Sequence, residues 1–265
     1  MLCHYSIFTI GNMAEPKISV MPSEDKGIDK RFLKLPHHEI LFKPPFTAVI
    51  LGAIGAGKTS LGYTMMNDLY KNYFDEVVIL CGTLDSKKAW ENINQKTVIF
   101  LDHLDENALK AYMEVLEKDQ LERQEKHKFP IRVAMVMDDV VFEGFNRNRV
   151  GYLEKLLMVT RHFNVTMIFM LQHSKMISAA MRNQIFYYAL MRVTTNDLEK
   201  IADEHANHLT SKEFKELYHS VQKKGKHEFM IIDYKAPYDR RFRHRFTKII
   251  GNPTIEDASS SSEEE

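Results

Sequence analysis

Apolar runs of strand length alternate with segments of helical periodicity along most of this chain. Residues 133–137 carry no polar side chain, which is typical of a strand buried on both faces of a parallel sheet. Between residues 107 and 126, apolar side chains recur at helical spacing. The pattern predicts strands at residues 46–51, 76–81, 97–101, 132–137, 165–171, 185–193 and 228–234, and helices at residues 59–72, 107–126, 149–163, 195–206 and 211–223.

This alternation predicts an α/β fold in which helices flank both faces of a mostly parallel sheet. It divides the chain into an N-terminal arm or lead-in at residues 1–45, a single domain at residues 46–235 and a terminal segment at residues 236–265. The terminal segment begins with a basic and aromatic strip, residues 239–246, and ends in an acidic run of Ser and Glu. Such low complexity favours disorder at the end of the chain.

The overall composition narrows the choice of partners. A hydrophobic fraction of 44% with 27% charged residues is ordinary for a soluble globular protein. The longest apolar runs are too short to span a bilayer, so we expect no membrane partner. Because 36 basic side chains balance 36 acidic ones, contact with DNA would need a local patch or several subunits acting together.

Cysteine and histidine usage argues against two kinds of structural site. The two cysteines, Cys3 and Cys81, speak against a disulfide scaffold and fit a reducing cytosolic compartment. The 12 histidines show no metal-ligand spacing with these cysteines, so we expect no structural zinc. The first residues lack the basic start of a signal peptide, and the sequence leaves open whether Met1 or Met13 is the true start.

The strand at residues 46–51 runs directly into a phosphate-binding pattern, Gly-x-x-x-x-Gly-Lys-Thr. Its glycines let the backbone curl so that successive N–H groups point at phosphate oxygens. Lys58 reaches the β- and γ-phosphates, the Thr59 hydroxyl is placed to bind Mg²⁺, and a helix starting near Lys58 aims its positive end at the same anion. The segment predicted to bind the nucleotide is Gly52, Ala53, Ile54, Gly55, Ala56, Gly57, Lys58, Thr59 and Ser60.

A glycine-rich turn without a nucleotide is the alternative, but the strand before the pattern and the helix after it favour the nucleotide. We therefore predict a P-loop nucleoside triphosphatase fold of the RecA or FtsK type, with ATP and Mg²⁺ as cofactors.

An acidic pair follows the buried strand at residues 132–137. A P-loop enzyme needs a carboxylate opposite the lysine to hold Mg²⁺, and Asp138 fits that role, with Asp139 as the base that activates water. Either aspartate could instead cap the helix that follows. Glu143 is a weaker alternative for the base.

The spacing of these motifs also indicates a subclass. Lys58 and Asp138 lie 80 positions apart (138 − 58), which leaves room for a strand and a helix and favours the ATPase arrangement with an extra strand between the two motif strands. The strand at residues 165–171 ends in Gln172, whose amide could bond both the γ-phosphate and the attacking water. An ordinary polar residue at a strand end is the alternative for Gln172.

Taken in order, several short motifs resemble the DNA-packaging ATPases of large double-stranded DNA viruses, the poxvirus type and its virophage relatives, within the FtsK–HerA superfamily. The resemblance covers roughly residues 46–193, and its second acidic position is Asp139 where many members carry Glu. The motifs are Gly-Ala-Gly-Lys-Thr at 55–59, Met-Asp-Asp at 137–139, Thr-Arg-His-Phe-Asn-Val at 160–165, Leu-Gln-His at 171–173 and Met-Arg-Asn-Gln at 181–184.

The resemblance implies a pentameric or hexameric ring of identical subunits that threads double-stranded DNA into a capsid at its vertex. ATP would lie between subunits, and a neighbour would supply an arginine to the γ-phosphate, for which Arg161 and Arg182 are the candidates. Either could instead be a surface or ion-paired arginine. The implied location is the host cytoplasm or viral factory, or the virion itself.

The strip at residues 239–246 holds four arginines interleaved with two phenylalanines and a histidine. It could hold DNA phosphates, form a subunit interface or be a basic strand edge. Alternatives to a packaging motor are a cellular translocase or helicase of the same superfamily, a P-loop nucleoside or nucleotide kinase, and a nucleotide-gated structural subunit.

Overall fold

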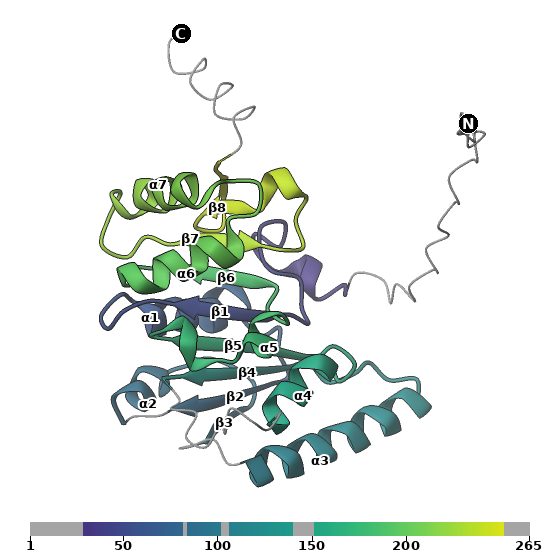
Figure 1. Cartoon of the computed structure of the whole chain (residues 1–265). Helices are drawn as coiled ribbons and strands as arrows, with labels where there is room; N and C mark the ends of the chain where they lie inside the picture. Colours follow the sequence, from purple (N-terminus) through teal and green to yellow (C-terminus); the bar gives the residue numbers. More distant parts are fainter. Residues whose placement is uncertain (1–28, 82–83, 102–105, 140–150, 252–265) are drawn as a thin grey trace, which may run out of the picture.

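The computed structural model describes residues 29–81, 84–101, 106–139 and 151–251, and the statements below concern these residues. Its centre is a nine-stranded sheet in the order β3-β2-β4-β5-β1-β6-β7-β8-β9 (Figure 1). The strands are β1 (Thr47–Leu51), β2 (Glu76–Cys81), β3 (Val98–Leu101), β4 (Val133–Asp138), β5 (Val165–Leu171), β6 (Tyr187–Leu190), β7 (Met230–Asp233), β8 (Phe242–His244) and β9 (Lys248–Ile249).

The first six strands are parallel and the last three antiparallel, as the α/β alternation predicts for most of the sheet. The central strands β1, β4 and β5 are buried at every position, which confirms that residues 133–137 form a strand covered on both faces. In space, β5 lies between β4 and β1, so the predicted extra strand between the two motif strands is present.

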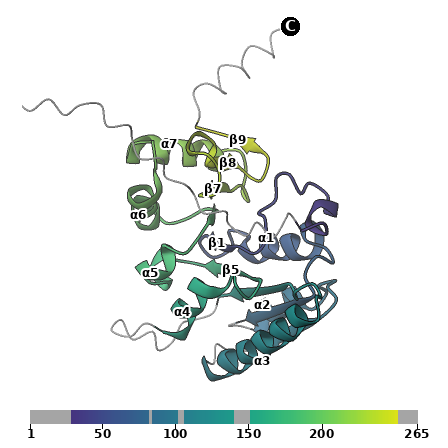
Figure 2. The same ribbon diagram turned by 90° about the vertical axis from the view of Figure 1, so that its right-hand side faces the viewer.

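Helices cover both faces of the sheet, as predicted (Figure 2). One face packs against α3 (Glu106–Glu125), α4 (Tyr152–Val159), α6 (Thr195–His205) and α7 (Ser211–Gln222). The other packs against α1 (Lys58–Thr64), the π-helical turn η2 (Met65–Leu69) and α2 (Leu84–Trp90). Short turns complete the described chain at η1 (Phe32–Lys34), η3 (Ser174–Met176), α5 (Ala179–Arg182) and η4 (Tyr238–Arg240). None of the described helices combines the length and apolar character needed to cross a membrane.

Residues 29–45, the described part of the predicted lead-in, are irregular but packed. Phe42 is buried and stacks on Tyr187 of β6 with 3.8 Å between ring centroids. The Tyr70 hydroxyl donates a hydrogen bond to the Phe42 carbonyl oxygen at 2.7 Å. This aromatic packing therefore anchors the lead-in to the face of the sheet that carries α1.

Some elements escape the pattern of apolar positions. The predicted helix at residues 59–72 is instead α1 followed by the π-helical turn η2, and α2, α5, β8 and β9 are additional. Strand β8 has no apolar run, because the strip at residues 239–246 alternates Arg with Phe and His. It forms because its backbone pairs with β7, with Ile231 opposite Arg243.

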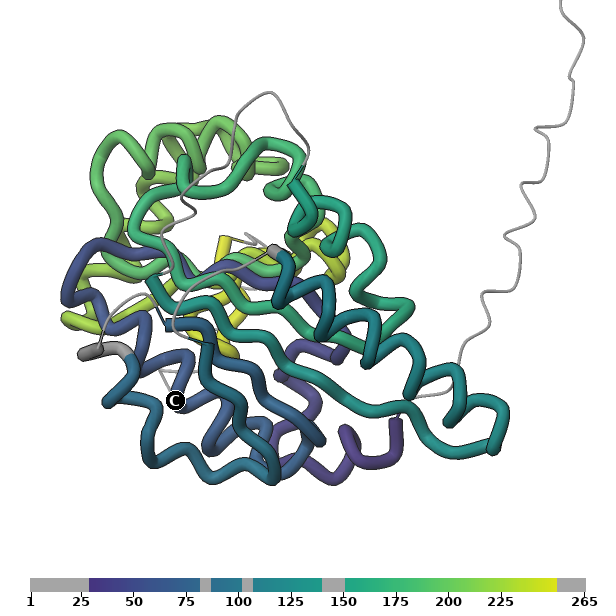
Figure 3. Tube along the Cα trace, turned by 90° about the horizontal axis from the view of Figure 1, so that it is seen from below, coloured from purple at the N-terminus to yellow at the C-terminus, as the bar shows by residue number. Residues whose placement is uncertain are grey.

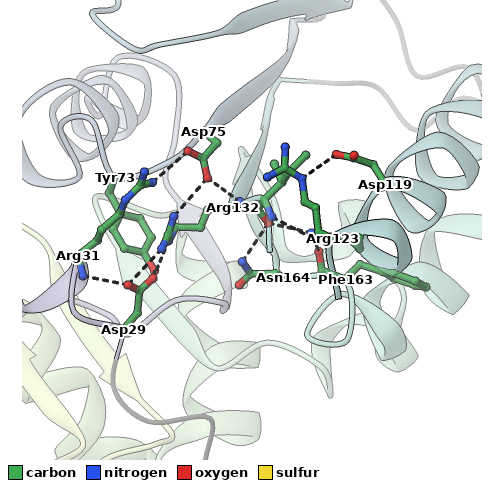
Figure 4. Close-up of polar contacts among 11 residues, drawn as sticks. Asp29, Arg31, Tyr73, Asp75, Asp119, Arg123, Arg132, Phe163 and Asn164 are labelled. Atoms are coloured by element: carbon green, nitrogen blue, oxygen red, sulfur yellow. Dashed lines mark hydrogen bonds and ion pairs between the residues drawn. The ribbon is translucent and has the colours of Figure 1, made fainter. Parts of the chain in front are cut away.

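Ion pairs tie the lead-in to the edge of the sheet where β2 and β4 begin (Figure 4). Arg132 is only 6% exposed and contacts the carboxylates of Asp29, at 2.5 Å from its Nε, and Asp75, at 3.2 Å from its Nη1. Arg31 also pairs with Asp75 at 3.0 Å. Burial acts to raise the pKa of Asp29 and of Asp75, but hydrogen bonds from the arginines outweigh it and lower both pKa values.

We expect Arg132→Ala to lower the free energy of unfolding by about 3 kcal/mol, because it leaves two partly buried carboxylates without their shared cation. The matched control is Arg123→Ala, which breaks an exposed pair with Asp119 and should cost about 0.5 kcal/mol. Urea denaturation measures both. Equal losses in the two variants would contradict the central role of Arg132.

The Arg132→Ala variant also leads to a prediction about the pH dependence of stability. Because the pKa values of Asp29 and Asp75 are lowered in the folded state, their contribution is present above the ordinary aspartate pKa and is lost as the pH falls through the lowered values. The difference in stability between wild type and Arg132→Ala should therefore shrink in acid.

Candidate active site

The predicted motif residues meet at one edge of the sheet. Strands β1, β4 and β5 are parallel neighbours, so their carboxyl ends lie together, where open α/β sheets bind ligands. The P-loop, residues 52–59, follows β1, Asp138 ends β4, and Gln172 follows β5. The fold thus collects three motifs that are far apart in the sequence.

At Gly57 and Gly52 of the P-loop, a side chain would be strained or crowded. Gly57 has φ = 103°, in the left-handed region that residues with a Cβ rarely adopt. A Cβ at Gly52 would lie 3.0 Å from the Cβ atoms of Ala56 and Met191. The loop is held at its start by Gly52 N–H, which donates to the Leu171 carbonyl oxygen at 3.0 Å.

Lys58 begins α1, as predicted, and its side chain is only 6% exposed. Its Nζ donates a hydrogen bond to the Gly52 carbonyl oxygen at 3.0 Å and lies 3.9 Å from Asp139 Oδ1. The ammonium group therefore lies inside the curl of the P-loop and close to the acidic pair, where it can serve an anion.

Asp138 is fully buried and held by two donors. The Thr59 hydroxyl donates to Oδ2 at 3.0 Å and lies 3.3 Å from Oδ1, and the Trp90 indole Nε1 donates to Oδ2 at 3.0 Å. Burial raises the pKa of the Asp138 carboxyl, whereas the hydrogen bonds from Trp90 and Thr59 oppose this rise by stabilising the charged form.

Asp139 occupies a backbone conformation with φ = 49°, which Asp tolerates better than most residues. Among the described atoms, its buried Oδ1 has no hydrogen-bond partner, although Lys58 Nζ lies 3.9 Å away. A carboxylate oxygen that is buried and unbonded beside the P-loop lysine suits a base. That role stays a prediction, and the alternative base, Glu143, lies outside the described residues.

Gln172 is half-buried at the end of β5, between the strands that carry the other motifs. The chain just after it is fixed by Asp197 of α6. This carboxylate accepts hydrogen bonds from the Ser174 backbone and hydroxyl, both at 2.9 Å, and lies 2.9 Å from His173 Nδ1. The position fits the predicted sensor, which remains untested.

The two candidate arginines lie at the opposite edge of the sheet. Arg161 precedes β5 and Arg182 precedes β6, and both strands run parallel to β1. Neither is therefore brought to the P-loop of its own chain, and a role on a neighbouring subunit stays a prediction.

The two arginines differ in the contacts that they make. Arg182 makes a two-pronged ion pair with Glu204, at 3.0 Å for each bond, and also donates to the Ile177 carbonyl oxygen. Arg161 is exposed, lies 5.1 Å from the centre of the Phe186 ring and forms no ion pair with any described residue. Arg161 is therefore the better candidate, because its guanidinium is free to meet an anion.

The strip at residues 239–246 is poorly suited to hold DNA phosphates, because most of its arginines are engaged within the chain. Arg243 pairs with Asp233, Arg245 with Glu228 at 2.6 Å, and Arg241 donates to the Asn207 side chain at 2.6 Å. Part of the strip is β8, in the interior of the antiparallel part of the sheet. These pairs favour a structural role within the fold.

Two residues that contact the site have no sequence motif. Trp90 is the only tryptophan of the chain, and its bond to Asp138 depends on how α2 packs on the sheet. His227 precedes β7 and reaches the P-loop, with Nδ1 3.0 Å from the Ala56 carbonyl oxygen. Only the single tryptophan offered a signal, since the N–H of a Trp usually finds a hydrogen-bond partner when the side chain is buried.

The donor set fits Mg²⁺ and a nucleotide. Magnesium is commonly held by one or two protein oxygens together with water and substrate phosphates, and the Thr59 hydroxyl and Asp138 carboxylate supply such oxygens. Among the described residues, no group of three or more His, Cys, Asp or Glu side chains could hold a metal by itself. Any metal here would thus depend on phosphate ligands.

Comparison with known proteins agrees with this geometry. A model of the poxvirus A32 protein family matches residues 34–238 of the chain. The crystal structure of B204, the DNA-packaging ATPase from Sulfolobus turreted icosahedral virus, covers 79% of this chain and 100% of its own, with a TM-score of 0.56 and 14% identity. No curated protein matches the chain in sequence.

The genome-packaging NTPase B204 from Sulfolobus turreted icosahedral virus 2 is similar as well. Its complex with ATPγS has a TM-score of 0.50 at 14% identity and covers 79% of this chain and 100% of its own. Its complex with sulfate has a TM-score of 0.52 at 14% identity, with 79% and 99% covered. These likenesses confirm the predicted P-loop fold.

The hydrogen bond from Trp90 leads to a prediction about pH. Trp90→Phe removes a donor that lowers the pKa of Asp138, so this pKa should rise further and Asp138 should be protonated at a higher pH. If ionised Asp138 is needed for ATP hydrolysis, the acidic limb of the pH–rate profile moves to higher pH.

The control is Tyr63→Phe, which removes a nearby hydrogen bond to the Asn92 carbonyl oxygen without touching Asp138. It should leave the acidic limb in place. An unchanged profile for Trp90→Phe would show that the indole N–H does not tune the carboxylate.

Proposed function

Because this chain belongs to the poxvirus A32 protein family, we propose that it is an ATP-hydrolysing motor that moves double-stranded DNA into a viral capsid. The observation that carries the proposal is the convergence of Lys58, Thr59, Asp138 and Asp139 at one sheet edge, with β5 between the two motif strands. The similarity in fold to B204, described as a DNA-packaging ATPase, supports the choice of DNA as the load.

The residues divide the chemistry among them. Lys58 exchanges its bond to the Gly52 carbonyl for the negative phosphate oxygens, and its near-complete burial strengthens that attraction. Thr59 and Asp138 would hold Mg²⁺, which would supply positive charge to neutralise the phosphates. Asp139 accepts the proton of the water that attacks the γ-phosphate, because its Oδ1 is close to Lys58 and otherwise unbonded.

The active site is completed by a second subunit in this proposal. The P-loop edge offers Lys58 as its cation, while Arg161 projects from the opposite edge of the sheet. In a pentameric or hexameric ring, Arg161 of one subunit would face the nucleotide of the next. An arginine in this role contributes on the order of 10³–10⁵ in rate in other P-loop enzymes.

A nucleoside or nucleotide kinase and a cellular translocase are less well supported, because the family match covers most of the described fold and names a poxvirus protein. A kinase would consume ATP only when a small acceptor is present to receive the γ-phosphate. A motor would instead respond to the polymer that it moves. The two classes are therefore separated by the ligand that accelerates ATP consumption.

We expect Lys58→Ala to weaken ATP binding by about 2–5 kcal/mol, because the phosphates lose a buried charged partner. In the wild type, ATP hydrolysis should rise on addition of long double-stranded DNA, and Lys58→Ala should show neither basal nor stimulated hydrolysis. The matched control is Lys71→Ala, which removes an exposed lysine beyond η2. Stimulation by a nucleoside in place of DNA would contradict the motor.

Subunit mixing tests the shared site. Lys58→Ala subunits retain Arg161, and Arg161→Ala subunits retain an intact P-loop, so mixtures of the two inactive proteins should regain part of the ATPase activity. Arg182→Ala serves as the control, because Arg182 is paired with Glu204 in its own chain, and it should stay active alone. Failure of the mixture to recover any activity would rule out Arg161 as the residue supplied by a neighbour.

A further inference from the structure

The loop between α7 and β7, residues 223–229, reaches the P-loop although the two are distant in the sequence. Both loops lie at the same edge of the sheet, at the left in Figures 1 and 3. His227 Nδ1 lies 3.0 Å from the Ala56 carbonyl oxygen. A Cβ built at Gly57 would lie 3.0 Å from the same nitrogen, so the imidazole also packs directly against Gly57.

In this hydrogen bond the histidine must be the donor. A carbonyl oxygen can only accept a hydrogen bond, so Nδ1 of His227 carries the proton and donates it. The bond holds from the outside a peptide group, Ala56–Gly57, that belongs to the phosphate-binding loop. It is the only side-chain hydrogen bond seen on residues 53–57 in the described structure.

Peptide geometry converts this contact into an effect on ligand binding. The Ala56–Gly57 peptide is trans, since Pro44–Pro45 is the only cis bond in the described chain. In a trans peptide the C=O and N–H point in opposite directions. Fixing the Ala56 carbonyl toward His227 therefore turns the Gly57 N–H away from His227. Amides of a P-loop point in this direction when they face phosphate.

His227 is itself held in place by its neighbour. Glu228 is 9% exposed and accepts hydrogen bonds from Arg245, at 2.8 and 2.6 Å, with His244 Nε2 at 2.6 Å. Its carbonyl oxygen accepts another from Gln222 of α7 at 3.1 Å. Through Arg245 and His244, the strip at residues 239–246 thus anchors the loop that braces the P-loop.

We propose that His227 is a positioning residue of the nucleotide site, which holds the Ala56–Gly57 peptide so that the Gly57 amide is presented to the phosphate chain. The inference rests on the proposed nucleotide-binding function and adds a residue to it. His227 should therefore affect the binding of the phosphates and not of the base. This expectation distinguishes a residue that positions the P-loop from one that contacts adenine directly.

The experiment measures, by calorimetry on the full chain, the affinity of His227→Ala and His227→Asn for ATPγS and for tripolyphosphate, which has no base or sugar. Asn carries its amide nitrogen at the same place along the side chain as Nδ1 of His. We expect His227→Ala to weaken both ligands roughly three- to tenfold, the range of one net hydrogen bond, and His227→Asn to restore most of the affinity.

A second pair of measurements separates bracing from folding. Thermal unfolding should be nearly the same in both His227 variants, because His227 is an exposed residue outside the core. In combination with Glu228→Gln, the loss in His227→Ala should be less than additive, since Glu228 acts through His227. Full additivity would contradict the anchoring role.

The outcomes distinguish this inference from the function on which it rests. If the wild type binds neither ligand, the nucleotide-binding function fails, and the inference fails with it. If the wild type binds both and His227→Ala binds equally well, only the inference is overturned. Weakening confined to ATPγS, or equal losses in the Ala and Asn variants, would also overturn it.

Discussion

The buried carboxylate of Asp138 is the constraint on which the candidate site depends. A fully buried charge is costly unless donors surround it, and here Thr59 from the P-loop helix and Trp90 from α2 supply them. These bonds join β4, α1 and α2 in one fixed arrangement. The same arrangement keeps Lys58 Nζ 3.9 Å from Asp139 Oδ1. The packing that buries Asp138 therefore also positions the other charged side chains of the candidate site.

The two ends of the described chain act as supports for this centre. The lead-in is joined to the start of β4 through Asp29 and Arg132, and its aromatic side chains pack on the face that carries α1. At the other end, Glu228 gathers Arg245 and His244 beside the residue that touches the P-loop. Segments whose sequence resembles a charged surface therefore stabilise the fold, because their charges are paired within the chain.

Much of the fold could be predicted because burial on both faces leaves a plain pattern. Strands β4 and β5 are continuous apolar runs, and the P-loop carries its glycines and Lys58 in a fixed order. The apolar pattern did not predict strand β8, since Arg243 and its neighbours carry no apolar run and pair through the backbone. A basic strand edge was one alternative for this strip, but β8 lies between β7 and β9 and not at the edge of the sheet. The pairing of Arg182 with Glu204 was equally hidden, because the partners come from separate helices.

The type of chemistry could be predicted from local sequence, since a strand followed by Gly52–Thr59 and a later Asp138 is the pattern expected of a phosphate site with a metal ligand. Which side chains surround that site depends instead on the packing of the folded chain. Trp90, His227 and the free position of Arg161 depend on contacts between elements far apart in the chain, and such contacts leave no local pattern. Local backbone preferences are encoded in neighbouring residues, whereas hydrogen-bond partners are set by the packing of the whole sheet.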